Sequence, residues 1–336
     1  MSLQIDPLPS ILYPINAMPE KMIVGVDLGG SKIKVILSDS GGNIVKGDLR
    51  DTLAPEGPEA VIKRIIDSIR QVASGADIAG IGIGAAGAYE ASTGVITLSP
   101  NLPGWHNIPL RAIIQKEFSV PIYMENDATV AALGEHYFGG GVGIANLVYV
   151  SVGTGIGGGI IIDGQLYRGA SGSAGEFGHM TIDINGPRCN CGNIGCWEAY
   201  ASGIALAEEA VRQIESGTQT TILNFAEGDL RKVTARRVFL AAVEGDPLAQ
   251  RVISQTAYYL GVGLANLVNI FNPQLILIGG GLSRMGSLLL DPAIKVVRER
   301  AFELPSRAVR IEIAQLGADA EALGAAGLVI QEQFRA

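Results

Sequence analysis

Residues 22–49 read MIVGVDLGGSKIKVILSDSGGNIVKGDL, and residues 147–169 read LVYVSVGTGIGGGIIIDGQLYRG. In both stretches, runs rich in valine and isoleucine are interrupted by glycine-rich turns, which is typical of antiparallel strands with short connections. The first stretch predicts a three-stranded meander with turns at GGS and SGGN. The second repeats the pattern about 125 residues later. The two stretches therefore predict two copies of one α/β architecture.

Each meander is followed by signals for helices and for one more buried strand. Apolar residues recur at i, i+3, i+4 and i+7 in Glu59–Ala73 and Pro247–Phe271, as they do in amphipathic helices. The apolar runs IAGIGIGAAG at 78–87 and LILIGGGLS at 275–283 are expected to form corresponding strands of the two halves. Chance similarity between glycine-rich strands is the alternative to this duplication.

The composition excludes several classes of protein. The 336 residues are 48% hydrophobic and 17% charged, with 45 glycines, which indicates a well-packed chain with many tight turns. The net charge of -8 argues against nucleic acid or an anionic membrane as the partner. Residues 1–20 lack the basic start and long apolar run of a signal peptide, and no run of eighteen apolar residues predicts a membrane span. A cytoplasmic location is therefore expected.

The glycine-rich turns are candidates for binding phosphate. GTGIGG at 153–158 matches the GxGxxG fingerprint of dinucleotide-binding folds, but it leads into another strand rather than into a helix. Ser31 and Thr154 give each turn a hydroxyl, and such turns expose backbone N–H groups to phosphate oxygens. Asp27, just before the first turn, could orient Mg²⁺ through water. Plain hairpins are the alternative interpretation of each turn taken alone.

All three cysteines lie within eight residues of one another, close to a histidine. His179, Cys189, Cys191 and Cys196 make up the four nitrogen and sulfur ligands of a tetrahedral zinc site. Four such ligands leave no open position, so the metal is expected to be structural. Three inert thiols beside a core histidine are the alternative.

The segment PIYMENDATVAALGEHYFGGG predicts a strand to Met124 and a helix through about Phe138. Asp127 between them is expected either to be the N-cap of the helix or to deprotonate a bound hydroxyl. Glu176, His179 and Glu198 flank the cysteines and could bind a polyol. A carboxylate at a helix start is more often solvated or favoured by the helix dipole, which is the alternative for Glu198.

Together these segments resemble the ROK family of sugar kinases and related repressors, from about Ile23 to Gly327. The strongest element is GEFGHMTIDINGPRCNCGNIGCWEAYASG, which is similar to the family's E-x-G-H motif followed by C-x-C-G-x-x-G-C-x-E. DLGGSKIK resembles the first phosphate segment, with Ser31 where threonine is usual. GTGIGGG resembles the second phosphate segment, and IGGGLS resembles the nucleoside contact.

The resemblance implies an α/β, two-domain, actin-like ATPase (ribonuclease H-like) fold with a structural zinc loop. The smaller domain is expected at 21–134 plus 320–336, the larger one at 135–319, and residues 1–20 form an N-terminal extension. ATP, Mg²⁺ and Zn²⁺ are the implied cofactors. The implied nucleotide contacts are Asp27, Gly29, Gly30, Ser31, Lys32, Gly153, Thr154, Gly155, Gly280 and Gly281.

On the acceptor side, the resemblance implies Asp127 as the catalytic base. The implied sugar contacts are Gly87, Asn126, Asp127, Glu176, His179 and Glu198. His179 would bind zinc through one ring nitrogen and the sugar through the other. The cysteines would then fix the metal that orients a substrate-binding histidine.

The implied activity is ATP-dependent phosphorylation of a hexose. SPNLPGWHNIPL and ENDATVAALGEHYFG are more similar to bacterial glucokinases than to fructokinases, which favours glucose as the substrate and its C6 hydroxyl as the acceptor. N-acetylmannosamine kinase and fructokinase are the alternatives within the family, mannose is a plausible second substrate, and polyphosphate is an alternative donor. The resemblance also implies a homodimer or homotetramer.

Two further interpretations belong to other functional classes. Repressors of this family carry a helix-turn-helix ahead of the first phosphate segment, whereas the proline-rich stretch before Met22 contains no basic helix. We therefore expect an enzyme rather than a sugar-responsive repressor. A zinc hydrolase is disfavoured because the ligand set is closed.

Overall fold

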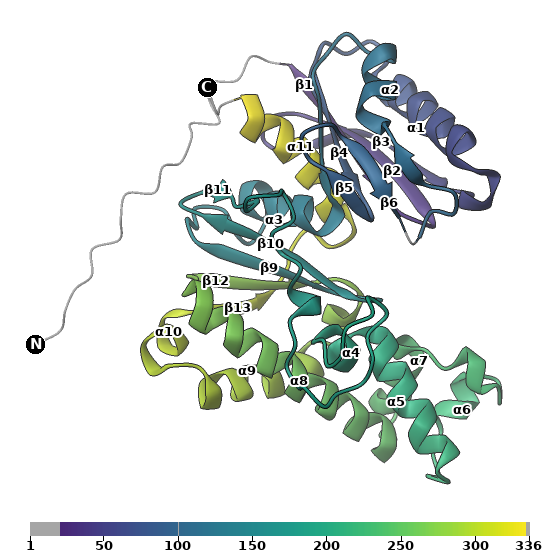
Figure 1. Cartoon of the computed structure of the whole chain (residues 1–336), viewed down its shortest axis with the longest axis vertical. Coiled ribbons are helices and arrows are strands. Elements are labelled where there is room, and N and C mark those ends of the chain that lie inside the picture. The colour runs from purple at the N-terminus through teal and green to yellow at the C-terminus, as the bar shows by residue number, and fades with distance from the viewer. Residues whose placement is uncertain (1–20, 100, 334–336) are drawn as a thin grey trace, which may run out of the picture. The chain divides into compact units, whose positions relative to one another are not determined.

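The computed structural model describes residues 21–99 and 101–333, so the expected extension at 1–20 lies outside the described residues. The chain divides into two compact units. The first contains the chain up to Tyr149, Gly159–Gly175, and the chain from Gln315 onward. The second contains Val150–Gly158 and Glu176–Ala314. Figure 1 labels the elements of both units.

The first unit is built on a five-stranded sheet with the order β3-β2-β1-β4-β8. Its strands are β1 (Met22–Leu28), β2 (Lys32–Ser38), β3 (Ile44–Asp51), β4 (Ile78–Ala85) and β8 (Ile122–Asn126). Its helices are α1 (Pro58–Ala73), α2 (Leu110–Glu117), α3 (Asp127–Phe138) and α11 (Ala320–Gln333), with the 3₁₀ turns η2 (Ala54–Glu56) and η6 (Gly317–Asp319). A smaller sheet consists of β5 (Ala88–Glu90), β6 (Val95–Leu98) and β7 (His106–Ile108).

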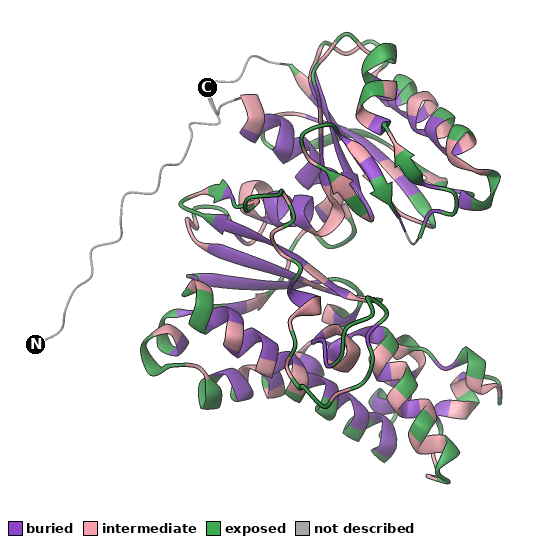
Figure 2. Ribbon diagram, viewed as in Figure 1, coloured by how far each residue is buried: buried purple, intermediate pink, exposed green. Residues whose placement is uncertain are grey.

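The side-chain alternation of β1 places helices on both faces of this sheet. Val24 and Val26 point into the core that also contains the apolar faces of α1 and α2, whereas Ile23 packs with α11. Gly25 and Gly82 allow α11 to approach closely, because a Cβ there would lie 2.0 Å and 1.8 Å from backbone oxygens of the helix. Figures 1 and 2 show the buried strands between α1 and α2 on one side and α11 on the other.

The predicted meander is confirmed, since β1 pairs antiparallel with β2, and β2 pairs antiparallel with β3. Strands β4 and β8 continue the sheet parallel to β1. β8 extends to Asn126, two residues beyond the predicted end at Met124, because Asn126 still pairs with Ala85.

A second sheet repeats this order as β11-β10-β9-β12-β13. Its strands are β9 (Leu147–Val152), β10 (Ile156–Ile162), β11 (Gln165–Leu166), β12 (Leu275–Gly279) and β13 (Arg310–Ile313). In both sheets the first strand of the series lies between the second and the fourth, and β12 runs parallel to β13 as β4 does to β8. The predicted duplication is therefore confirmed.

Most of the segment Glu176–Ala314 of the second unit is helical. Its helices are α4 (Glu198–Ala201), α5 (Gly203–Glu215), α6 (Ile222–Phe225), α7 (Ala235–Val243), α8 (Pro247–Phe271), α9 (Ser287–Arg300) and α10 (Glu303–Ala308), with the 3₁₀ turns η3 (Phe177–His179), η4 (Leu230–Lys232) and η5 (Gly281–Met285). The strand predicted at 275–283 ends at Gly279, because Gly280 has a φ of 78° and the chain turns there into η5. No helix among the described residues is both long and apolar enough to span a membrane.

The division into units differs from the domain boundaries expected from the sequence. Residues 135–149, 159–175 and 315–319 belong to the first unit rather than to the second. One reason is the close packing of α3 on α11, where a Cβ on Gly134 would lie 2.5 Å from the backbone oxygen of Ala320. A boundary after residue 134 would cut α3 at this contact.

Candidate active site

The parallel strands of the first unit end at one edge of the sheet, and predicted site residues gather there. Leu28 of β1 lies beside Ala85 of β4, and Ala85 lies beside Asn126 of β8. Asp27 and Asp127 are sequence neighbours of the first and last of these residues. The two predicted carboxylates are therefore at the same edge, which is where open α/β sheets bind ligands.

The two polar residues at the junction of β8 and α3, Asn126 and Asp127, have different roles in the structure. Asn126 is the N-cap of α3, and its side chain accepts the N–H groups of Ala128 at 3.0 Å and Thr129 at 3.4 Å. Asp127 is the first residue of the helix, and its carboxylate accepts the N–H of Ala128 at 2.8 Å. The prediction of Asp127 as the N-cap is thus wrong, since Asn126 has that role.

Burial raises the pKa of three neighbouring carboxyl groups, and nearby negative charge adds to the rise for Asp27 and Glu321. Burial raises the pKa of Asp27 to about 7, and the charges of Glu321 and Asp127 add to the rise. Lys34 opposes it. Burial also raises the pKa of Asp127 and of Glu321. A half-buried group of carboxylates with raised pKa is suited to take up a proton or to face a cation.

Two predicted site glycines of the first unit lie against neighbouring backbone. A Cβ on Gly30 would be 2.7 Å from the carbonyl oxygen of Asn101. Gly87 has a φ of +113°, and a Cβ there would be 2.6 Å from the carbonyl oxygen of Leu98. Both positions therefore require glycine, and Gly87 lies just after β4 at the edge described above.

The first glycine turn is held from the side by Thr52. The Thr52 hydroxyl donates to the carbonyl of Gly29 at 2.7 Å, and its N–H donates to the carbonyl of Ser31 at 2.9 Å. The Ser31 side chain is exposed. Lys32 forms an exposed ion pair with Asp51 at 2.6 Å. A nucleotide would therefore compete with Asp51 for the Lys32 ammonium group.

The four predicted metal ligands come together in the second unit. Their ligand atoms all lie within 4.8 Å of one another. The sulfurs of Cys191 and Cys196 are 3.7 Å apart, and the sulfur of Cys189 is 3.8 Å from Nδ1 of His179. Two sulfurs at about 2.3 Å from a tetrahedral zinc ion are separated by about 3.8 Å. The cluster therefore fits a structural Zn²⁺.

His179 has a second ring nitrogen directed away from Cys189. Nε2 lies 4.0 Å from a carboxylate oxygen of Glu176. The side chains of His179 and Glu176 are 38% and 66% exposed, so both are accessible to a ligand. One imidazole ring can thus serve the metal cluster and a substrate together.

Glu198 links the cysteine-containing loop to the second glycine turn. Its Oε2 accepts the backbone N–H of Ile156 at 2.8 Å, and a Cβ on Gly155 would lie 2.2 Å from the same oxygen. Its Oε1 lies 3.9 Å from the sulfur of Cys189. Gly155 is therefore required for this contact, which no motif in the sequence indicated.

A pocket of about 880 Å³ in the second unit borders the second glycine turn. Its wall includes three predicted nucleotide contacts, Gly153, Thr154 and Gly281. Apolar and basic side chains that sequence reasoning missed also line it, among them Phe239, Leu240, Leu282, Met285, Arg236 and Arg284. This volume lies in the range of small-molecule binding sites, and such sites also have mainly apolar walls.

The predicted residues thus fall into groups that belong to separate units. Asp27, Gly87, Asn126 and Asp127 lie in the first unit, and the zinc ligands, Glu176, Glu198 and the pocket lie in the second. The predicted contact Gly280 does not line the pocket, and this position requires glycine because a Cβ there would lie 2.5 Å from the Val152 carbonyl oxygen. Glu321 of α11, whose charge acts on Asp27, was not predicted as a site residue because no sequence motif distinguishes it.

The sequence pattern of the ROK family matches residues 23–332 of this chain. The chain belongs to the ROK family. Over 317 residues it is 38% identical to the xylose repressor of Caldicellulosiruptor bescii, a match covering 93% of this chain and 79% of the repressor. Over 316 residues it is 37% identical to the glucokinase of Thermotoga maritima, covering 93% and 98% of the two chains.

A solved structure extends the comparison of this ROK protein to three dimensions. The crystal structure of a ROK family glucokinase from Streptomyces griseus in complex with glucose and AMPPNP has a TM-score of 0.80 and 35% identity. The match covers 92% of this chain and 99% of the glucokinase. The resemblance and the two-domain actin-like fold expected from the sequence are therefore confirmed.

Proposed function

We propose that this protein is an ATP-dependent sugar kinase that phosphorylates glucose at its C6 hydroxyl. The observation that carries the proposal is the position of Asp127. Its carboxylate lies at the carboxyl edge of the first sheet, while Asn126 caps the following helix. Asp127 is therefore free of the capping role and available to accept a proton.

The pocket of the second unit supports binding of the nucleoside of ATP. Its apolar walls suit a nucleobase, and the exposed side chains of Arg236 and Arg284 bring positive charge to its lining. The turn that starts at Gly153 borders the same pocket and exposes backbone N–H groups that suit phosphate oxygens. The phosphates of ATP would thus be bound by the glycine turn that starts at Gly153, and not by a Walker loop.

The carboxylates of the first unit support the transfer step. Asp127 would accept the proton of the sugar hydroxyl as that oxygen attacks the terminal phosphorus of ATP and ADP leaves. Asp27 would hold Mg²⁺ through water, and the ion would supply neutralisation of phosphate charge. The raised pKa of Asp27 fits a carboxyl that faces a cation when substrate is bound.

The cysteine-containing loop supports recognition of sugar hydroxyls. Glu176, Nε2 of His179 and Glu198 offer acceptors and donors, and Zn²⁺ held by the sulfurs would fix the imidazole ring. Gly87 and Asn126 are the proposed contacts from the first unit. Glucose, rather than N-acetylmannosamine or fructose, remains the proposed substrate on the strength of the glucokinase relatives.

A coupled assay of ADP release tests this function and its specificity together. Glucose, mannose, fructose and N-acetylmannosamine are supplied separately with ATP or polyphosphate. We expect the highest kcat/KM with glucose and ATP. Turnover with N-acetylmannosamine alone would reassign the substrate, and no turnover with any sugar would reject the kinase.

A sugar-responsive repressor is the second candidate, because the chain is 38% identical to a xylose repressor. Repression requires sequence-specific DNA binding that a sugar relieves. An electrophoretic mobility shift with the DNA upstream of the protein's own gene, with and without xylose and glucose, tests it. A sugar-sensitive specific shift would favour the repressor, and its absence beside measured kinase turnover would favour the enzyme.

A further inference from the structure

A buried carboxylate lies directly before the proposed catalytic pair. Glu125, in β8, is 1% exposed, and its two oxygens receive three hydrogen bonds. Oε1 accepts the Tyr89 hydroxyl at 2.5 Å and the backbone N–H of Asn126 at 3.0 Å. Oε2 accepts Nε of Arg168 at 2.7 Å. The carboxylate is therefore bonded to the backbone of the residue that caps α3.

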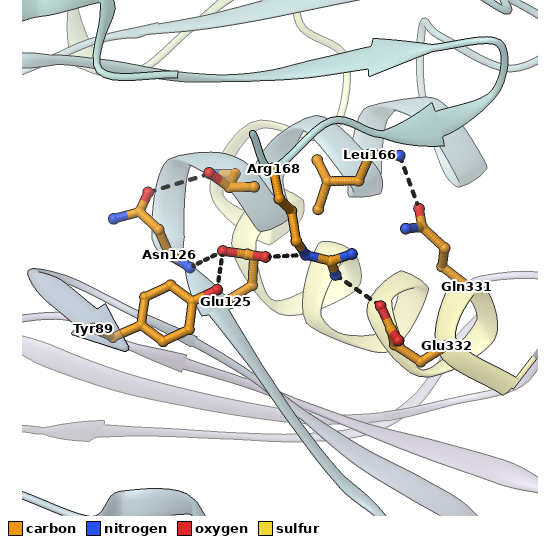
Figure 3. Close-up of polar contacts among 8 residues, drawn as sticks. Tyr89, Glu125, Asn126, Leu166, Arg168, Gln331 and Glu332 are labelled. Atoms are coloured by element: carbon orange, nitrogen blue, oxygen red, sulfur yellow. Dashed lines mark hydrogen bonds and ion pairs between the residues drawn. The ribbon is translucent and has the colours of Figure 1, made fainter. Parts of the chain in front are cut away.

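Arg168 joins this carboxylate to the C-terminal helix. Its Nη2 donates to Glu332 of α11 at 2.8 Å, so the guanidinium bridges two carboxylates. The backbone two residues earlier is tied to the same helix, since the N–H of Leu166 donates to the Gln331 side chain at 3.3 Å. Figure 3 shows Arg168 between Glu125 and Glu332, with Tyr89 on the far side of Glu125.

The chain that follows Arg168 is rich in glycine. Gly169, Gly172 and Gly175 have φ values of +67°, +84° and +103°. The N–H of Ala174 donates to the Arg168 carbonyl at 3.1 Å. The segment then enters the second unit at Glu176. Arg168 thus anchors the start of a segment whose backbone favours glycine.

These contacts make Glu125 a point where separate segments meet. Tyr89 belongs to β5, which follows Gly87, while Arg168 brings in the end of β11 and α11. A buried charge without its partner is strongly destabilised, so loss of Arg168 would force the Glu125 carboxylate to move. That movement would change the bond from the N–H of Asn126.

We propose that Arg168, through Glu125, is a positioning residue for Asn126 and Asp127. The ion pair fixes the junction of β8 and α3, so that the carboxylate of Asp127 points to the acceptor hydroxyl. This inference rests on the proposed function, because it assigns the positioning to a phosphoryl-transfer base. Arg168 touches neither the sugar nor the nucleotide in this account.

Arg168→Lys is the informative variant. Lysine keeps the positive charge but offers a compact ammonium instead of a planar fork, so it cannot reproduce both bonds of the guanidinium. Arg70→Lys is the matched control, because Arg70 also pairs with a glutamate of the first unit, Glu117, but on the exposed surface. Both variants are compared with the wild type as full-length protein.

The first measurement does not depend on activity. Hydrogen exchange of the amides of Ala128 and Thr129, which donate to Asn126, reports the junction directly. We expect exchange about tenfold faster or more in Arg168→Lys, because local opening at the junction becomes easier, with Arg70→Lys unchanged. Equal exchange in the wild type and Arg168→Lys would overturn the proposal, even if the wild type proved to lack kinase activity.

The second measurement separates positioning from general stability. In Arg168→Lys we expect kcat to fall about tenfold or more while the KM for ATP stays within about twofold. In an Asp127→Asn background the same substitution should change kcat less than about twofold. An equal fall in both backgrounds would show that Arg168 does not act through Asp127 and would overturn the proposal. A wild type without sugar phosphorylation would instead reject the proposed function, and exchange alone would then decide the positioning.

Discussion

At the scale of single residues, the junction of β8 and α3 assigns one task to each side chain. Asn126 bonds the first free N–H groups of the helix, and Asp127 lies one residue further on. An asparagine is about as good an N-cap as an aspartate, so a cap does not require a carboxylate here. We therefore propose that the carboxylate of Asp127 serves proton transfer.

Asp127→Asn should lower kcat by about 10²–10⁴ because an amide cannot take the proton of the acceptor hydroxyl. The helix keeps its Asn126 cap, so the melting temperature should stay close to that of the wild type. Steady-state kinetics and calorimetry measure both. The KM for ATP should not change, since the pocket lies in the second unit. An active Asp127→Asn protein would remove Asp127 from the mechanism.

Asp27→Asn should reduce the pH dependence of stability in Mg²⁺-free buffer. The pKa of Asp27 in the folded protein is about 7, above the ordinary value of 3.8, so the folded state binds this proton more tightly than the unfolded state. Its contribution to stability is therefore greatest at low pH and is lost as the pH rises through about 7. In urea unfolding from roughly pH 5 to pH 8, the free energy of unfolding of the variant should increase relative to that of the wild type as the pH rises. Parallel curves would contradict the raised pKa.

Site residues that belong to a sequence motif could be predicted, whereas those outside any motif could not. The cysteine spacing predicted the four ligands that lie within 4.8 Å of one another. Nothing local distinguishes Arg168 or Glu321, whose partners are distant in the chain and depend on the packing of α11. The choice of Asn126 over Asp127 as N-cap also depends on where β8 ends, which the pattern placed two residues early.

At the scale of elements, the cysteine-containing loop and the second glycine turn are coupled by one carboxylate. Glu198 lies near Cys189 and accepts the N–H of Ile156. We therefore expect a change in the loop to affect the turn that borders the pocket. The extents of α1 and α8 were predicted from their apolar periodicity, whereas this cross-loop contact has no periodic signal.

Cys191→Ser should release the metal and raise the KM for sugar, because His179 and Glu198 lose their frame. Elemental analysis should find one zinc per wild-type chain and little in the variant. Ser283→Ala serves as a control outside the loop, and its zinc content should equal that of the wild type. A metal-free Cys191→Ser protein with wild-type kinetics would break the proposed link between zinc and substrate.

At the scale of the whole molecule, the duplicated sheet order was predictable from two similar meanders. The unit boundary was less predictable, because α3 joins α11 through close contacts of glycines such as Gly134 and Gly324. Composition and motifs carry no information on such long-range packing. A homodimer or homotetramer stays a prediction.

Glucose should reduce the radius of gyration measured by small-angle scattering. The proposed sugar contacts belong to both units, so a bound sugar would tie the units together and exclude water before transfer. Galactose, if it does not bind, gives the matched control. An unchanged radius, with glucose binding confirmed by calorimetry, would contradict this expectation.

The decisive test of the proposed kinase is phosphorus NMR of a mixture of ATP, Mg²⁺, glucose and the purified protein. We expect the ATP signals to be replaced by those of ADP and of glucose 6-phosphate in equal amounts, and Asp127→Asn to leave the mixture almost unchanged. Release of inorganic phosphate without a sugar phosphate, or a wild type that leaves ATP intact in the presence of each sugar tested, would contradict the proposal.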